Sequence, residues 1–376
     1  MHPYKQFPPR QFWQQAVSGT PWAEVLAHEP GKFSITASDV VASAGSCFAQ
    51  RISRLIIDSG LDYRYFETPH PLVPAAEAAT LGYKLFSCRY GNIYTTRQLL
   101  QVVKEALAIT PPIQAVSATK AGHFVDLMRP NINSSGFESA EEAVADRAWH
   151  LQCVARMLAQ CNVFIFTLGL TETWMDSETG VVYGSHPSVI THLPSARPMK
   201  AHNLDYLECY NDLVEVFNLM RGINPGVRFI LTVSPVALAA THQPQNVLVS
   251  TAYSKAVLRA VAGRFAQVLP CVDYFPSFEV FNLAQSFGQF LSEDLRDVSQ
   301  RGVQVAMGNF KQMFLQGAAA AAAPVASAVP AVASCAPPGA AQAEAAKPAA
   351  PAVSATNAAD VECDEVLNAF FDKATA

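Results

Sequence analysis

The stretch “DVVASAGSCFAQRISRLI”, residues 39–56, contains the clearest signal of secondary structure in the sequence. Its first part is a run of small and β-branched residues that ends at Gly45, as expected of a buried strand. From Cys47 onward, apolar residues recur at helical spacing until Gly60 ends the pattern. The sequence therefore predicts a strand that passes through a very tight turn, with Ser46 at its centre, directly into a helix.

The rest of the chain repeats this alternation. Strands are predicted at 39–45, 61–66, 162–170, 227–236 and within 269–280. Helices are predicted at 47–60, 95–109, 139–161, 203–224, 246–267 and, as the last one, within 298–316. Strands that alternate with helices indicate an α/β fold with a doubly wound, mostly parallel sheet between two helical layers, as in flavodoxin-like proteins.

The chain divides into four predicted parts. Residues 1–37 are rich in Pro and aromatic residues and are expected to form an arm that packs on a domain of residues 38–316. Residues 317–355 are mostly Ala and Pro, which favours a disordered linker. Residues 356–376 are predicted to form a short amphipathic helix. Its residues 360–372 would suit docking to a protein partner, although a frayed helix without function fits the pattern as well.

Composition excludes several classes of function. The 376 residues carry a net charge of −5 with scattered Lys and Arg, so no nucleic-acid partner is expected. The first residues do not resemble a secretory signal, and no apolar run is long enough to span a membrane. A cytoplasmic protein is expected. The eight cysteines form no CxxC pair and the nine histidines do not cluster with them, so no metal site and no cofactor is predicted.

Ligands of doubly wound sheets bind at the carboxyl ends of the strands, and four such ends here carry polar residues. The first is Ser46, at the start of a helix, where unpaired backbone N–H groups favour a developing negative charge. Ser46 could act as a nucleophile, with the N–H of Cys47 helping to hold the oxyanion. Taken alone, the segment favours an ordinary helix N-cap for Ser46, and the Cys47 thiol suits the core.

The second and third ends offer hydrogen-bond donors and one acid. Gly91 and Asn92 precede a helix and supply a backbone amide and a side-chain amide, although an ordinary turn uses the same residues. The stretch “TLGLTETW”, residues 167–174, follows a continuous apolar strand. Gly169 and Thr171 are further candidate donors there, and the carboxylate of Glu172 must be solvated or paired.

These segments, together with “LSEDLRDVSQRG” at 291–302, resemble in kind and order the motifs of SGNH hydrolases. The string “GSCFA” at 45–49, with “FSCRYGNIYTTRQLLQ”, “FTLGLTETW”, “LTVSPV”, “TAYSKAVLRA” and “DYFPSFEV”, resembles the GSCFA family of that clan over roughly residues 1–316. The resemblance implies that Ser46 is the nucleophile and that Gly91 and residues 169–171 supply oxyanion donors. It also implies an O-acylated carbohydrate or a similar small ester as substrate.

Two positions depart from the pattern of the clan. Thr171 stands where the clan has Asn, and its hydroxyl has a shorter reach. Asp297 stands where the clan has the His that serves as general base, three residues after Asp294. An ordinary carboxylate is a weak base for a serine hydroxyl. Three interpretations stay open: one of these aspartates is the base with a raised pKa, a histidine enters from elsewhere, or the protein does not cleave its ligand.

His202 is the candidate histidine, because it follows the long connection 176–202 at the same edge of the sheet. The leading hypothesis is thus a serine esterase or O-acyltransferase that acts through an ester on Ser46. The alternative is a catalytically silent glycan-binding, ester-binding or scaffold protein that docks a partner through its C-terminal helix.

Overall fold

A computed structural model describes residues 2–27, 29–282 and 284–315. The predicted linker at 317–355 and helix at 356–376 lie outside the described residues. Within them every helix is too short or too polar to cross a membrane.

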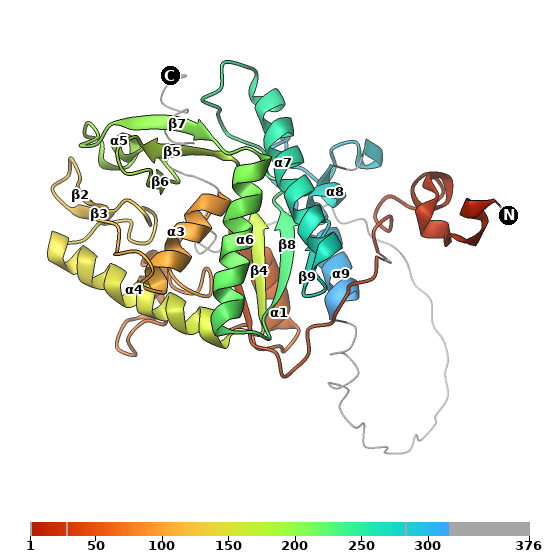
Figure 1. Ribbon diagram of the computed structural model, residues 1–376, viewed down its shortest axis with the longest axis horizontal. Coiled ribbons are helices and arrows are strands. Elements are labelled where there is room, and N and C mark those ends of the chain that lie inside the picture. The colour runs from red at the N-terminus through yellow and green to blue at the C-terminus, as the bar shows by residue number, and fades with distance from the viewer. Residues whose placement is uncertain (1, 28, 283, 316–376) are drawn as a thin grey trace, which may run out of the picture.

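The centre of the molecule is a parallel sheet in the order β1-β4-β8-β9 (Figure 1). Its strands are β1 (Val41–Gly45), β4 (Val163–Leu168), β8 (Arg228–Val233) and β9 (Val272–Phe275). All four fall inside predicted strands. The predicted strand at 61–66 is reduced to one parallel bridge between Val41 and Tyr63.

Helices cover both faces of this sheet, which confirms the predicted three-layer α/β class. One layer contains α1 (Ala49–Asp58), α8 (Ser277–Phe281) and α9 (Gln300–Phe314); the other contains α3 (Thr96–Ala106), α4 (Ala140–Gln160), α6 (Tyr206–Ile223) and α7 (Val247–Val268). Alternate residues of β4 point toward opposite helical layers. Phe164 and Phe166 pack against the second layer. Val163 and Ile165 pack against the first. The strand is therefore apolar throughout.

The remaining elements are small and lie outside the central sheet. An antiparallel sheet, β6-β5-β7, is formed by β5 (Glu172–Asp176), β6 (Val182–Tyr183) and β7 (Met199–Asn203), and a hairpin by β2 (Val116–Ala118) and β3 (Phe124–Asp126). Two short helices are α2 (Ala75–Thr80) and α5 (Pro187–Thr191). The connection at 176–202, expected to be loop, thus contains β6, α5 and most of β7.

The N-terminal arm contacts the domain in its second half. Its first turns, η1 (Pro3–Gln6), η2 (Pro9–Gln11) and η3 (Gln14–Ser18), bury no side chain and project away from the sheet (Figure 1). Further along, Trp22 packs on Phe290. Ile35 is fully buried in the cluster beneath α1 and α9.

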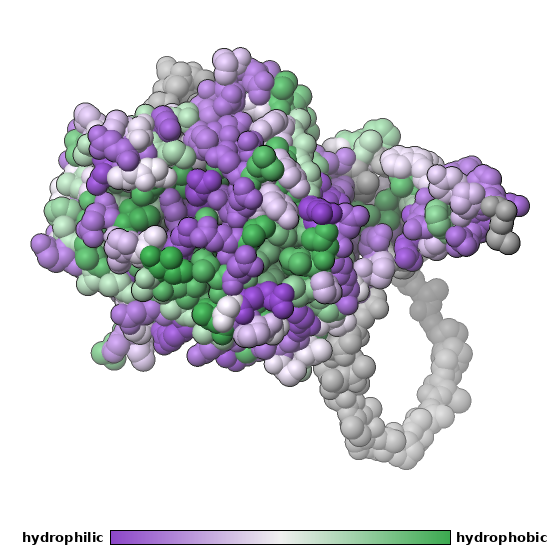
Figure 2. Space-filling model, viewed as in Figure 1, coloured by the Kyte–Doolittle hydropathy of each residue, from purple (hydrophilic) through white to green (hydrophobic). Residues whose placement is uncertain are grey.

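The surface over α4, α6 and α7 mixes hydrophilic residues with scattered hydrophobic ones (Figure 2). Trp149, Leu207 and Leu248 are among the exposed apolar side chains of these helices. Single exposed apolar residues of this kind are normal on soluble domains.

The tight turn after β1 depends on Gly45. Its φ is +131°, and a Cβ atom built on it would lie 2.4 Å from the Thr167 carbonyl oxygen and 2.7 Å from the Thr167 nitrogen. The amide of Ser46 donates to that same carbonyl at 3.3 Å, and the Gly45 carbonyl accepts from Ile93 N at 2.9 Å. Only glycine lets β1 approach β4 this closely and then turn into α1.

Replacing Gly45 by alanine should therefore destabilise the protein. We expect G45A to lower the free energy of unfolding by at least about 2 kcal/mol, through the clash with Thr167 and the unfavourable φ. Urea unfolding followed by circular dichroism measures it. The matched control is G222A in α6, where a Cβ atom meets nothing within 4 Å. This substitution should raise the free energy of unfolding by about 0.5–1 kcal/mol. Equal effects of the two substitutions would contradict this account of the turn.

Candidate active site

A small cavity lies at the carboxyl ends of β1, β4 and β8. Its volume is about 70 Å³, and its wall after β8 is the mainly apolar segment 236–240. Its other lining residues come from the turns after β1 and β4, from neighbouring loops and from the loop before α9: Ser46, Cys47, Tyr94, Gly169, Leu170, Ser234 and Arg296. Three candidates from the sequence thus meet here, namely Ser46, Cys47 and Gly169.

Ser46 does not cap the helix that it precedes. Helix α1 begins at Ala49 and has no side-chain hydrogen bond at its N-cap, Phe48. The Ser46 side chain is almost fully buried, and among the residues that the structure describes its Oγ has no hydrogen-bond partner. A buried hydroxyl without a partner normally costs stability, so it is typical of a group kept for chemistry. Cys47, beside it, is half-buried.

Arg296 reaches this cavity from the loop that contains both candidate aspartates. The exposed Asp294 accepts hydrogen bonds from the backbone amides of Arg296 and Asp297, at 3.0 and 3.1 Å, and so shapes the loop. Asp297 Oδ1 lies 3.2 Å from Arg296 Nη1. Neither aspartate lines the cavity, whereas Arg296 does, and its Nε is buried without a partner.

Lys255 contacts the Gly169 loop that borders the cavity, although it does not itself line the cavity. It is buried on α7, and its Nζ donates to the Gly169 carbonyl at 2.8 Å. Within the described ranges no carboxylate lies within ion-pair distance of it. Burial, and next the charge of Arg296, lower the pKa of Lys255 to about 7, so a large fraction of the side chain is a neutral amine at neutral pH.

The backbone amides of the loop after β4 donate hydrogen bonds to neighbouring parts of the protein. The amides of Gly169 and Leu170 both donate to the Tyr94 carbonyl, at 3.1 and 2.9 Å. The amide of Thr171 donates to Ser254 Oγ at 3.0 Å, and its hydroxyl donates to Asn203 Oδ1 at 2.6 Å. These groups therefore hold the loop in place, and Thr171 is fully buried away from the cavity lining.

Glu172 and His202 lie in the small antiparallel sheet, outside the cavity lining. The Glu172 carboxylate accepts from Thr241 Oγ1 at 2.6 Å and from the amide of His242 at 3.0 Å. His202 is on β7, where its Nε2 lies 2.7 Å from Glu208 Oε1. The structure thus pairs the carboxylate of Glu172, and it places His202 on a strand rather than in a loop.

Gly91 and Asn92 lie next to the Ser46 turn without lining its cavity. Gly91 has a φ of +65°, and the following residue, Ile93, donates its amide to Gly45. Asn92 lines a separate chamber. In the part of the chain that the structure describes, no group of three or more His, Cys, Asp and Glu side chains could hold a metal ion.

Sequence reasoning did not single out Arg296 or Lys255. Each had a signal: Arg296 stands between the aspartates of “DLRD”, and Lys255 is a lysine at i, i+3 and i+7 spacing with the buried Leu258 and Ala262.

The chain was compared with models of known protein families. The model of the GSCFA family matches residues 40–310, well over half of the chain. Comparison with curated proteins finds no match.

Two solved structures are distantly similar. A carbohydrate esterase family 3 protein from Talaromyces cellulolyticus aligns at 12% identity over 72% of this chain and 92% of its own, with a TM-score of 0.31. A protein described as a GDSL-like lipase from Parabacteroides merdae aligns at 14% identity over 75% and 98%, also with a TM-score of 0.31. Neither value is high enough to bear on activity.

The unpartnered hydroxyl of Ser46 leads to a stability prediction. Since Ser46 Oγ makes no hydrogen bond, S46A should leave the free energy of unfolding within about 0.5 kcal/mol of the parent or raise it. The control is S277A, at a fully buried serine that donates to the Val233 carbonyl at 2.8 Å; it should cost about 1–2 kcal/mol. Thermal and urea unfolding measure both. A loss in S46A as large as in S277A would mean that Ser46 has a structural partner.

Proposed function

The chain belongs to the GSCFA family, and from this premise we propose that it is a serine esterase or O-acyltransferase with Ser46 as nucleophile. The observation that carries the proposal is the buried, unpartnered Oγ of Ser46, a residue that lines a cavity together with Arg296, a cation whose Nε also has no partner among the described residues. An attacking hydroxyl and a donor for the developing oxyanion are the two groups that acyl transfer requires.

In the proposed reaction Ser46 Oγ attacks the carbonyl carbon of an ester and gives its proton to the neutral amine of Lys255. The carbonyl oxygen becomes negative and accepts a hydrogen bond from Arg296 Nε. Collapse of the intermediate expels the alcohol, which takes the proton from Lys255, and leaves an ester on Ser46. Water in an esterase, or an acceptor hydroxyl in a transferase, then attacks that ester by the same steps.

Lys255 is our choice of proton acceptor because it is held against the wall of the cavity at Gly169 and lacks a carboxylate partner. The other candidates fit less well. Asp297 is paired with Arg296, and Asp294 is exposed. His202, on β7, is paired with Glu208, on α6. A lysine that titrates near neutral pH is suited to general base catalysis.

The cavity also bears on the substrate. A volume of about 70 Å³ holds only a few water-sized groups, and the wall at 236–240 is mainly apolar. We therefore propose a short acyl group, with the alcohol part, an acylated carbohydrate, lying outside the cavity. The choice of a carbohydrate as the alcohol part of the substrate rests on the family resemblance.

Labelling with a fluorophosphonate probe tests the mechanism. The probe should modify Ser46, as mapped by mass spectrometry, and S46A should abolish labelling. K255M should slow labelling roughly 100-fold or more, because the general base is lost. In the parent protein the labelling rate should rise as the pH increases through about 7, since Lys255 loses its proton there. K311M, at an exposed lysine of α9, is the matched control and should label normally.

Other labelling patterns would contradict parts of the proposal. Labelling that depends on His202 or Asp297 but not on Lys255 would move the role of base to that residue. Absence of labelling over a wide pH range would contradict the enzyme and favour the ester-binding or scaffold alternative.

Acyl-chain length tests the size of the cavity. We expect acetyl esters to be turned over with a kcat/KM at least about tenfold higher than hexanoyl esters, because the longer chain does not fit into the cavity. Leu238 lies in the cavity wall, so L238A should enlarge it and narrow this ratio, whereas the exposed L295A should not. Equal turnover of short and long esters would show that the acyl group binds elsewhere.

A further inference from the structure

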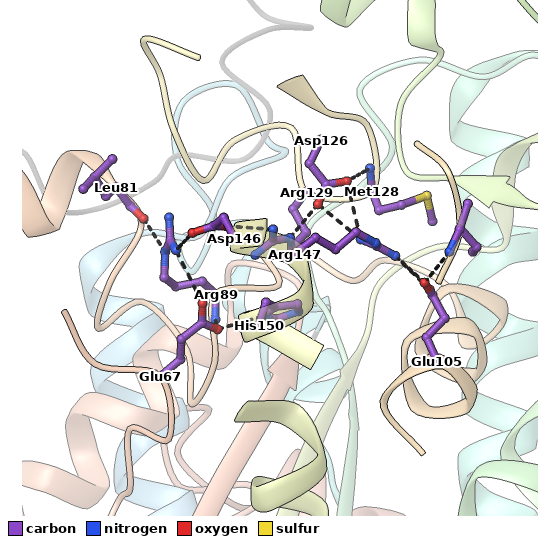
Figure 3. Close-up of polar contacts among 11 residues, drawn as sticks. Glu67, Leu81, Arg89, Glu105, Asp126, Met128, Arg129, Asp146, Arg147 and His150 are labelled. Atoms are coloured by element: carbon purple, nitrogen blue, oxygen red, sulfur yellow. Dashed lines mark hydrogen bonds and ion pairs between the residues drawn. The ribbon is translucent and has the colours of Figure 1, made fainter. Parts of the chain in front are cut away.

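A cluster of buried charges lies around helix α4 (Figure 3). Each of its three arginines contacts two carboxylates. Arg89 pairs with Glu67 and Asp146, Arg129 with Asp126 and Asp146, and Arg147 with Asp126 and Glu105. Most of these pairs are closer than 3.3 Å. The charges of this ion cluster are thus nearly balanced, which burial demands.

His150 joins the ion cluster as a neutral group. Its Nδ1 lies 2.7 Å from Glu67 Oε2. Burial would raise the pKa of Glu67, but the bond with His150 and the nearby cations lower it to about 2, so Glu67 is a carboxylate. Burial, and then the charge of Arg129, lower the pKa of His150 to about 4. The neutral ring therefore carries its proton on Nδ1, and Nε2 is a bare acceptor.

Four buried polar atoms that have no hydrogen-bond partner among the described residues belong to residues that line one chamber beside this cluster. They are Arg129 Nη1, Arg147 Nε, His150 Nε2 and Asn92 Oδ1, and all four residues line the same chamber of about 20 Å³. Arg129, Arg147 and His150 are each more than nine-tenths buried. Each orphaned atom would lower the stability of the fold if it stayed unsatisfied.

We infer that this chamber is a binding site for one water molecule, which accepts hydrogen bonds from Arg129 and Arg147 and donates to His150 and Asn92. Two donors and two acceptors are the complement of the hydrogen bonds of water. The volume exceeds the roughly 10–15 Å³ that a single water needs and leaves no room for a larger ligand.

The chemistry of the lining disfavours an ion. An anion would face the bare acceptors His150 Nε2 and Asn92 Oδ1, in a cluster whose four carboxylates already outnumber its three arginines. A cation would face two guanidinium groups. A neutral molecule that both accepts and donates meets neither penalty.

The bound water connects the ion cluster to the Ser46 turn. It holds Asn92, and the next residue, Ile93, donates its amide to Gly45, directly before Ser46. Tyr94 then lines the Ser46 cavity and holds the amides of Gly169 and Leu170. Asn92 is therefore a positioning residue that acts through the water, a role that does not require the protein to be an enzyme.

A high-resolution crystal structure of the protein tests the site directly. We expect one density peak within hydrogen-bond distance of all four atoms. A dry chamber with ordered side chains would overturn the proposal. So would a chloride ion, which its anomalous signal distinguishes from water.

Hydrogen exchange of the Ile93 amide tests the connection independently of any activity. N92L removes the acceptor and should lower the protection of this amide about tenfold, the equivalent of one lost hydrogen bond. N92D keeps an acceptor oxygen in the same place and should preserve both the water peak and the protection. Unchanged protection in N92L, with the water absent from its crystal structure, would overturn the positioning role.

Discussion

The approach of Gly45 to Thr167 is the contact on which the rest of the site depends. It joins β1 to β4 at the point where both strands end, and it leaves no room for a side chain. The chain must turn there, so Ser46 lies at the sheet edge before the first turn of α1 rather than within it. The Gly45 carbonyl also fixes Ile93, and Tyr94 in turn fixes the loop at Gly169. Three segments distant in sequence thus take their places from one backbone contact.

Two groups of buried polar residues contain side-chain atoms that lack a hydrogen-bond partner among the described residues. In the ion cluster every arginine pairs with two carboxylates, and the proposed water would satisfy the orphaned atoms of Arg129, Arg147 and His150. At the cavity, Ser46 Oγ and Arg296 Nε have no partner, and Lys255 has only a carbonyl. With that water bound, the ion cluster would be a rigid support that keeps its partners, whereas the groups at the cavity must exchange partners during the proposed reaction.

Much of the fold could be predicted from the sequence because its signals are local. The apolar runs and helical spacings placed the four central strands and six major helices within a few residues. Ser46 could be predicted for the same reason, since strand, glycine and helix are adjacent in the chain. Lys255 and Arg296 could not, because they meet at Gly169 and its cavity from positions far apart in sequence. His202 was expected in a loop at the edge of the central sheet, but hydrogen bonding to β5 places it on the small antiparallel sheet, which local spacing does not reveal.

The contact between Asp297 and Arg296 offers a physical reason for an aspartate at the position where a histidine was expected. Asp297 contacts Arg296 through Nη1, and so helps to hold a guanidinium whose Nε lies at the Ser46 cavity. Burial, and next the charge of Arg296, lower the pKa of Lys255. In the proposed reaction, one cation thus has two roles: it stabilises the oxyanion, and it keeps the neighbouring amine neutral enough to take a proton. A histidine at 297 would neither bind Arg296 in this way nor be needed, since the proton acceptor would come from α7.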